Sequence, residues 1–402
     1  MRGCLNIWLV GQIYWIGYQM RVVFITHYSS LYGANRSLLN LIDGLREYGV
    51  KSFVLCPSKG EMTTALKKRD VPFVILPFKG WMSSSILSRI KAPARLILNL
   101  IILPSLLYKV KKWKPDVIYT NSSVTPIGIL IAFFLRKPHI WHIREFGWLD
   151  YQLRYDFGEK FFKYWLNKSD AIIAISKAVK QVVLNGVRTK TYIIYNGVIS
   201  RVEADVLKKQ LNLYSKLPNY TFAIVGGLFP NKGQEQAIRA LACLKKNYPN
   251  TRLLIVGSGS EDYLKQLKDL CENLNIQEQV KFWGYISNPF EVYLKVDAVL
   301  MCSKYEAMGR VTAEAMAAAK PVIGYNSTGT AELIENGKTG LLYDGDYKNL
   351  AQCMARFIEN PKWAQQLGIN GWEKARKEYT VEVYAKQVYD VLREIRSKAT
   401  YK

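Results

Sequence analysis

Short runs made almost wholly of Val, Ile and other apolar residues recur along this chain, and segments with helical periodicity separate them. In the first half the runs include 22–26, 115–122 and 171–176, and the interval 38–49 has apolar residues at helical spacing. A strand that is apolar at every position is buried on both faces, as in parallel sheets that helices cover on both sides. The pattern therefore predicts a doubly wound α/β fold.

The same alternation restarts after Asn196-Gly197, where residues 220–241 and 251–270 each have the pattern of a strand, a glycine turn and a helix. A chain of 402 residues, 49% of them hydrophobic, is long enough to bury two cores. We therefore expect two α/β domains followed by a terminal helix, at 20–197, 198–380 and 381–402.

The first nineteen residues differ from the rest because they are apolar and aromatic after a single Arg. A membrane span needs about 20 apolar residues, and no A-x-A-like cleavage site follows. Met20 then precedes the first strand-like run. We expect residues 1–19 to lie outside the fold, with an interfacial membrane segment as the alternative.

Basic residues are concentrated in the first half of the chain. The formal net charge is +24, and residues 1–197 hold 28 Lys and Arg against 10 Asp and Glu, whereas the remainder holds 28 against 22. Such asymmetry favours a polyanionic partner. The six cysteines include no Cys-x-x-Cys pair and only three His are present, so we expect no zinc site and a cytosolic, reducing compartment.

The segment 95–116 has an apolar helical pattern that Pro104 interrupts, and it ends in four lysines around Trp113. An apolar face flanked by Lys and Trp is typical of helices that lie on an anionic membrane surface. The alternative is a core helix with a basic, solvated end. No helix-turn-helix, zinc-finger or RNA-binding signature accompanies the charge, so nucleic acid is not the expected partner.

Two acids stand eight positions apart in the segment 303–326, where a strand-like run is followed by a loop and a helix that begins near Gly309. Ligands of open α/β sheets bind at the carboxyl ends of strands, and the free amides of a helix start attract anions. A phosphate there would have hydroxyl-rich groups on either side. The spacing therefore suits a nucleotide sugar, with Glu314 accepting hydrogen bonds from ribose and Glu306 from the sugar.

The segment 303–344 resembles the donor site of family 4 nucleotide-sugar glycosyltransferases, in its E-x7-E spacing and in the motifs PVI, ELI and GxxGLL that follow. The upstream motifs IVGGLFPNKGQ, LLIVGSGS and VKFWGYI agree in order. The resemblance covers most of residues 20–395. It implies the GT-B architecture, in which two Rossmann-like domains face a cleft and a C-terminal helix crosses back to the first domain.

The resemblance assigns donor-side roles to several residues. Glu314 corresponds to the acid that binds ribose, and Glu306 to the acid near the reacting carbon. The amides of Met308 and Gly309 would meet the donor sugar and phosphate.

Further donor-side positions depart from the family pattern. Lys232 matches the lysine that neutralises the diphosphate, but Gly227 stands where an arginine usually helps it, so Arg310 is a candidate substitute. Gly33 matches the glycine loop of the first domain, where the family usually has a second glycine in place of Tyr32.

On the acceptor side, His142 matches a histidine often found near the reacting sugar, and the alternative is a buried strand histidine. Arg144 and Glu145 would bind the acceptor, or form a structural ion pair. We expect Glu306, His142 and Lys232 to be catalytic.

These assignments predict a retaining hexosyltransferase that uses a nucleotide-diphosphate sugar, with UDP favoured, and no metal or other cofactor. No obvious protein nucleophile is present. We therefore expect the acceptor to attack the donor sugar on the same face from which the nucleotide diphosphate departs. The expected acceptor is a lipid-linked saccharide, and the expected process is bacterial surface polysaccharide synthesis. We expect the protein to be cytoplasmic and peripheral on the inner face of the cell membrane. The alternatives are a GT-B nucleotide-sugar epimerase and a non-catalytic sugar-nucleotide binding protein.

Overall fold

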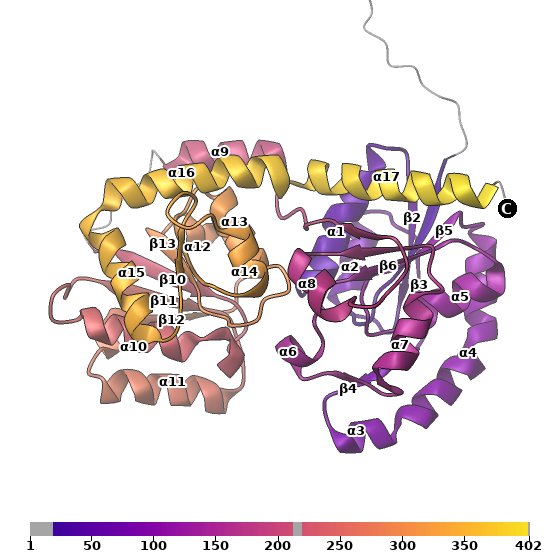
Figure 1. Ribbon diagram of the computed structural model, residues 1–402, viewed down its shortest axis with the longest axis horizontal. Coiled ribbons are helices and arrows are strands. Elements are labelled where there is room, and N and C mark those ends of the chain that lie inside the picture. Colours follow the sequence, from indigo (N-terminus) through magenta and orange to yellow (C-terminus); the bar gives the residue numbers. More distant parts are fainter. Residues whose placement is uncertain (1–18, 212–218, 401–402) are drawn as a thin grey trace, which may run out of the picture.

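The computed structural model describes residues 19–211 and 219–400, so almost all of the expected extension 1–19 lies outside the described residues. Two parallel sheets, each covered by helices on both faces, lie side by side, and long helices run across both (Figure 1). The predicted α/β, doubly wound architecture is confirmed. We name the halves the N-terminal domain, residues 19–200 with the terminal helix, and the C-terminal domain, residues 201–380.

The sheet of the N-terminal domain has the order β3-β2-β1-β5-β6-β8-β9, and all its neighbours pair in parallel. The strand order reverses between β1 and β5, which places a ligand-binding crevice beyond their carboxyl ends. The strands of this sheet are β1 (Arg21–Ile25), β2 (Lys51–Cys56), β3 (Phe73–Ile75), β5 (Val117–Thr120), β6 (His139–Ile143), β8 (Ala171–Ala174) and β9 (Thr191–Ile193).

Strand β1 shows why its run is apolar at every position. Val22 and Phe24 belong to the core that contains α1 (Gly33–Arg46) and α17 (Val381–Thr400). Val23 and Ile25 belong to the core that contains α4 (Ala92–Lys112) and α5 (Ile127–Leu135). All four side chains are fully buried. Successive side chains of a strand point to opposite faces, so only a continuous apolar run can satisfy two helical layers.

Two short strands far apart in the sequence pair antiparallel in a small sheet that the sequence did not reveal, and helices separate the other strands of the N-terminal domain. Its elements are α1 (Gly33–Arg46), α2 (Glu61–Lys68), β4 (Met82–Ser83), α3 (Ile86–Ile90), α4 (Ala92–Lys112), α5 (Ile127–Leu135), α6 (Trp148–Tyr151), β7 (Arg154–Tyr155), α7 (Gly158–Leu166) and α8 (Lys177–Val183). Helix α1 begins at Gly33, inside the stretch that was expected to be a loop, because Tyr32 already has the extended backbone of a cap residue.

Helix α4 is continuous, although Pro104 was expected to break it. A proline within a helix leaves the carbonyl four residues earlier without its partner. That carbonyl belongs to Leu100, which is 49% exposed, so water can satisfy it. Helix α4 is also long and apolar enough to cross a membrane by length and composition, yet only 22% of its most apolar window is buried in the protein.

The sheet of the C-terminal domain has the order β12-β11-β10-β13-β14-β15 and is also parallel throughout. Its strands are β10 (Thr221–Val225), β11 (Arg252–Val256), β12 (Val280–Gly284), β13 (Ala298–Met301), β14 (Val322–Tyr325) and β15 (Leu341–Tyr343). Its helices are α9 (Arg201–Leu211), η1 (Pro230–Lys232), α10 (Gln234–Leu244), α11 (Glu261–Asn273), η2 (Gln277–Gln279), α12 (Phe290–Tyr293), α13 (Arg310–Ala317), α14 (Thr328–Leu333), α15 (Tyr347–Glu359) and α16 (Pro361–Glu378).

The terminal helix α17 (Val381–Thr400) crosses back to the N-terminal domain and lies along α1 (Figure 1). Tyr384, Ala385 and Val388 are fully buried in the core of that domain. The contact is close, since a Cβ on Gly44 of α1 would lie 2.6 Å from the Ala385 Cβ. The crossing that the family resemblance implied is confirmed.

Two stretches of chain connect the domains and run side by side. The Val198 amide donates to the Tyr379 carbonyl at 2.9 Å, and the Val381 amide donates to the Ile199 carbonyl at 2.9 Å. A Cβ on Gly197 would lie 2.7 Å from the Val381 Cα. Glycine at 197 therefore allows the two connections to touch, and any relative motion of the domains must pass through this paired segment.

Candidate active site

The loop between β13 and α13 ends in Gly309, whose φ of 83° is a conformation that favours glycine. A Cβ there would lie 3.3 Å from Thr312 Oγ1 and 3.4 Å from Thr330 Oγ1. Both hydroxyl oxygens are buried without a hydrogen-bond partner in the described part of the chain. Buried hydroxyls normally have partners. The free amides of the helix start lie beside them, so this is a cluster of polar groups that suits an anion.

The loop before Gly309 is held in place by the start of α14. The Gly329 amide donates to the Glu306 carbonyl at 2.9 Å, and the Glu306 amide donates to Thr328 Oγ1 at 3.0 Å. A Cβ on Gly329 would lie 2.6 Å from the Met308 Cα, so α14 packs directly against this loop. The backbone amides of the site are therefore fixed before any ligand arrives.

Glu306 forms an ion pair with Lys232, with Nζ and Oε1 2.6 Å apart. The lysine ends η1, and Gly233 after it is positioned so that a Cβ would lie 2.6 Å from the Cys302 Cβ. The Lys232 side chain is 25% exposed and the Glu306 side chain 15%. Two of the three residues expected to be catalytic thus meet at the ends of β10 and β13, where both can still reach a ligand.

Glu314 is buried and shares its carboxylate between two neighbours. Arg310 Nε donates to Oε1 at 2.7 Å and the Tyr293 hydroxyl donates to Oε2 at 3.2 Å. Burial, with the charge of Glu314 as a second cause, raises the pKa of Tyr293 well above its usual value, so this phenol stays a donor. Arg310 Nη1 also donates to Ser37 Oγ of α1 at 3.0 Å. The guanidinium therefore joins the two domains and is already engaged by Glu314 and Ser37.

The remaining donor-side positions are glycines with different surroundings. Gly33 begins α1 on the surface, and a Cβ there would meet no atom within 4 Å. Gly227 accepts a hydrogen bond from Gln234 Nε2 at 2.9 Å, and a Cβ there would lie 2.6 Å from the Phe229 ring. Space for a ligand to approach is evident at Gly33, while Gly227 accommodates an aromatic neighbour.

His142 lies in the core of the N-terminal domain, not on the cleft surface that the resemblance implied. Its ring is fully buried, with Nδ1 2.5 Å from the Tyr119 hydroxyl and the Tyr384 ring beside it. Burial, and after it the charge of Arg144, lowers its pKa well below the usual range. The alternative of a buried, hydrogen-bonded strand histidine describes this geometry.

Arg144 and Glu145 are also buried, and each has partners of its own. The Arg144 guanidinium donates to Asn121 Oδ1 at 2.7 Å, to Asn196 Oδ1 at 2.5 Å and to the Tyr384 hydroxyl at 2.7 Å. It thereby joins β6, the domain connection and α17.

The Glu145 carboxylate accepts hydrogen bonds from the Ser122 hydroxyl at 2.9 Å and the Ser123 amide at 2.6 Å. Burial raises its pKa, while the bonds to Ser123 act against that shift. Within the described residues, Arg144 and Glu145 form no ion pair with each other, because other partners engage each of them. Their expected role in acceptor binding stays a prediction.

Asp150 is a residue of the cleft that the sequence analysis missed. It belongs to α6, and its main-chain carbonyl accepts from Asn231 Nδ2 of the C-terminal domain at 2.8 Å. Its Oδ1 is buried and has no partner in the part of the chain that the structure describes. Burial is the main cause of its raised pKa, and the charge of Glu306 contributes. Its position shortly after β6, at the carboxyl end of a strand, is the signal that could have identified it.

Several contacts hold the two domains together around these residues. The Glu332 carboxylate accepts from the Lys177 amide and from the Tyr195 hydroxyl, both at 2.9 Å. The Asn196 amide donates to the Met308 sulfur at 3.2 Å. Within the described residues, no group of three or more His, Cys, Asp and Glu side chains is placed to hold a metal ion.

Two family models match this chain, one for each domain. The model "Glycosyltransferase Family 4" matches residues 32–200, and "Glycosyl transferases group 1" matches residues 206–374. The chain belongs to the family 4 glycosyltransferases. A capsular polysaccharide biosynthesis glycosyltransferase, CapM of Staphylococcus aureus, is 27% identical over 68% of this family member and 75% of CapM.

A second relative is the GDP-mannose-dependent α-(1-6)-phosphatidylinositol monomannoside mannosyltransferase of Mycobacterium tuberculosis. It is 29% identical to this family 4 chain, and the alignment spans 43% of this chain and 47% of the relative. Among solved structures, HepE of Anabaena in complex with UDP and glucose has a TM-score of 0.75 and 24% identity, with coverage of 93% of this chain and 100% of HepE. This likeness shows the GT-B fold.

Proposed function

We propose that this GT-B glycosyltransferase moves a sugar, as a hexosyltransferase does, from a nucleotide-diphosphate sugar to a lipid-linked saccharide, with retention of anomeric configuration. The observation that supports it best is the two buried hydroxyls beside Gly309, without partners in the described residues, next to the start of α13 and the Lys232–Glu306 pair. These groups suit the diphosphate, and the ion pair would lie near the sugar. UDP is the favoured nucleotide, and HepE, which shares the fold, was solved with UDP and glucose.

Departure of the sugar puts negative charge on the β-phosphate and positive character on the sugar ring. Lys232 would turn from Glu306 to the phosphate, where the amides at Gly309 add fixed positive charge. Glu306, released from the lysine, would accept hydrogen bonds from the sugar. These groups supply the charge stabilisation that a metal provides elsewhere, so we propose that transfer needs no metal.

On the acceptor side, Asp150 Oδ1 is buried and has no hydrogen-bond partner among the described residues. We propose that it accepts a hydrogen bond from the acceptor saccharide. Since Asn231 of the other domain contacts the same residue, acceptor binding and domain closure would reinforce each other. Closure would also exclude water and limit donor hydrolysis.

We propose that the protein acts at the inner face of a bacterial membrane and takes part in surface polysaccharide synthesis. The basic charge of the first half and the exposed apolar face of α4 support this placement. The relative CapM is named for capsular polysaccharide biosynthesis, and the mycobacterial relative for a phosphatidylinositol mannoside, a lipid-linked acceptor.

The test is a thermal-shift and product panel with UDP-glucose, UDP-N-acetylglucosamine and GDP-mannose. We expect one donor to raise the Tm and to be hydrolysed slowly, releasing the nucleotide without an acceptor. Glu314→Gln should weaken donor binding, and Glu306→Gln should retain binding and lose hydrolysis. Glu272→Gln, an exposed position on α11, is the matched control.

The outcomes separate the competing activities. An epimerase would convert the donor into an isomeric nucleotide sugar without releasing the nucleotide, and a binding protein would raise the Tm without turnover. Either result would contradict the proposal. Retention is tested separately by the coupling constant of the anomeric proton in the product.

A further inference from the structure

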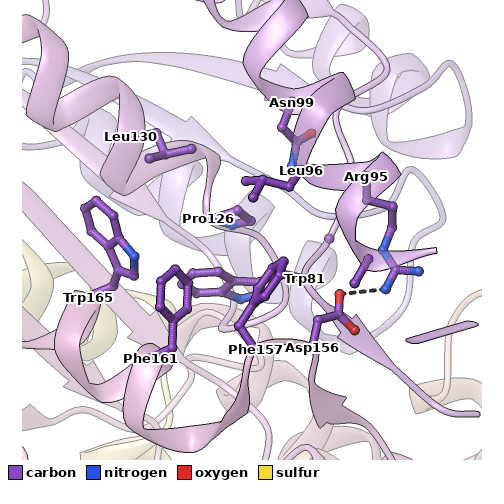
Figure 2. A pocket seen from close by; sticks show the side chains of 12 residues that line it. Trp81, Arg95, Leu96, Asn99, Pro126, Leu130, Asp156, Phe157, Phe161 and Trp165 are labelled. Carbon is purple, nitrogen blue, oxygen red and sulfur yellow. Dashed lines mark hydrogen bonds and ion pairs between the residues drawn. The ribbon is translucent and has the colours of Figure 1, made fainter. Parts of the chain in front are cut away.

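A pocket lined mainly by aromatic and aliphatic side chains lies between α4, α5 and α7 (Figure 2). Trp81, Phe161 and Trp165 form one wall, and Leu96 and Leu130 face them. Its cavity volume is about 50 Å³, small for a drug-sized ligand, so only a slender group could enter it. Its lining residues include none of the residues assigned to the transfer reaction.

The polar groups around this pocket are already engaged with the protein. Trp81 Nε1 donates to the Ser123 carbonyl at 2.7 Å, and the Asn99 amide exchanges hydrogen bonds of 2.7 and 3.0 Å with the Lys79 backbone. Asp156 pairs with Arg95 at 2.6 Å and accepts from Ser83. A sugar or a peptide would need free donors and acceptors here, whereas a hydrocarbon chain needs none.

One polar atom at the edge of the pocket differs from the rest. Within residues 19–211 and 219–400, Arg95 Nε is buried and has no hydrogen-bond partner, although the same guanidinium is paired through Nη2. The Arg95–Asp156 pair stands at one end of the pocket, away from Trp165 (Figure 2). The pocket therefore has an apolar interior and one polar end, an ion pair with a spare guanidinium N–H from which an anionic headgroup could accept a hydrogen bond.

The surface beside the pocket is apolar to an unusual degree. Of the 22 large hydrophobic side chains exposed in the described residues, 14 lie between residues 86 and 164. On α3, Ile86 is 82% exposed and Leu87 75%, and on α4 Ile101 is 68% exposed. Monomeric soluble proteins rarely expose so much apolar surface in one place unless it binds a partner or a membrane.

Charge around this surface favours an anionic lipid. Residues 71–115 contain eight Lys and Arg and not one Asp or Glu. Four of these lysines, at the end of α4 and just beyond it, are exposed. Basic residues near an apolar face attract anionic headgroups while the apolar side chains meet the acyl region.

The chain itself connects this pocket to the cleft. Asp150, whose free carboxylate oxygen we place on the acceptor side, and Asp156, at the polar end of the pocket, are joined by α6 and β7. A lipid with its chain in the pocket and its phosphate at Arg95 would extend its headgroup along residues 150–156. That path leads to the neighbourhood of Glu306, whose charge is felt at Asp150.

We propose that the pocket between α4, α5 and α7 binds the hydrocarbon chain of the lipid-linked, phosphate-bearing acceptor, with Arg95 at its anionic end. This inference rests on the proposed function, because it names the part of the acceptor that is not sugar. It makes the N-terminal domain a lipid-binding module as well as a wall of the active site.

The test measures quenching of tryptophan fluorescence by 12-bromododecyl phosphate below its micelle concentration. Trp81 and Trp165 line the pocket, so the bromine of a bound chain should quench them. Leu130→Phe and Leu96→Phe, which fill the pocket, should weaken the apparent affinity roughly tenfold, as excluding about two methylene groups would do. Val202→Gln on α9 of the other domain, where the side chain is 72% exposed, is the matched control and should leave quenching unchanged.

Equal quenching in the wild-type protein and in both filled variants would overturn the proposal, and so would its absence from the wild type. Retained stabilisation by the nucleotide sugar in the same variants shows that they are folded. A failure of the donor panel with intact quenching would instead contradict the proposed function alone, so the two ideas fail separately.

Discussion

Glu306 and Lys232 of the C-terminal domain and His142 and Arg144 of the N-terminal domain all lie at or near the carboxyl ends of parallel strands. The first two are partly exposed and form an ion pair in the cleft, whereas the other two are buried and hold secondary elements together. Similar topology thus leaves ionisable side chains partly exposed in the loops of one domain and buries them as structural support in the other. The N-terminal domain instead exposes apolar side chains on α3 and α4, the surface that we propose binds lipid.

The largest effect that would sharpen this comparison is expected for Glu306→Gln. Removing one group that stabilises transition-state charge typically costs about 10²–10³ in kcat. We expect that loss with a nearly unchanged KM for the donor, measured by nucleotide release. A loss below tenfold would show that the carboxylate is not near the reacting carbon. Glu272→Gln serves again as the control.

Arg144→Gln tests the opposite domain. The guanidinium donates to three different partners while buried, so its loss should lower the free energy of unfolding by about 2–4 kcal/mol. Donor KM at a temperature where the variant is folded should stay within about twofold, because no donor contact is removed. Urea unfolding and steady-state kinetics measure both quantities. Unchanged stability with a raised acceptor KM would restore the expected role in acceptor binding and break the comparison.

The response to acid should also differ between the domains, because all three histidines lie in the N-terminal domain. Burial lowers the pKa of His27 and of His139 from the usual 6.5 to about 3, and that of His142 well below its usual value. The unfolded chain therefore binds more protons below pH 6.5, and stability falls as the pH drops from 6.5 toward 3. Each histidine contributes up to about 1.4 kcal/mol per pH unit.

Hydrogen exchange read by peptide at about pH 7 and about pH 5.5 measures this prediction. Peptides of β1 and β6 should lose protection before those of β10 and β13. Glu145 and Asp150 have raised pKa values and act in the opposite direction as they take up protons, so the comparison stays above their ordinary range. Uniform loss of protection in both domains would contradict the prediction.

The smallest effect is expected from chelation. If Lys232 and the amides at Gly309 supply the positive charge for the diphosphate, adding EDTA should change donor turnover by less than about twofold. Restoration of activity by Mg²⁺ or Mn²⁺ after complete loss in EDTA would show that a metal performs this task. The assay is the same measurement of nucleotide release, with untreated protein as the control.

The sequence predicted the parallel sheets well because their signal is local, as in the continuous apolar run of β1. The donor-side loop was also local, with Glu306, Gly309 and Glu314 within nine residues of one another. The path of Arg310 to Ser37 in the other domain was not predictable, since it depends on how two separate domains dock. The burial of His142 could not be predicted for a similar reason, because the Tyr384 ring beside it belongs to α17 at the other end of the sequence.

The packing of α17 on α1 has a consequence for synthesis. The core around Leu38, Leu41 and Ile42 is completed by Tyr384, Ala385 and Val388, which follow the whole C-terminal domain in the chain. The N-terminal domain is synthesised first, but its core stays incomplete and apolar side chains of α1 stay uncovered until the C-terminal domain and α17 have been synthesised. Nonsense mutations that spare every donor-side residue but stop translation before Tyr384 would accordingly yield a protein whose earliest-made domain cannot mature.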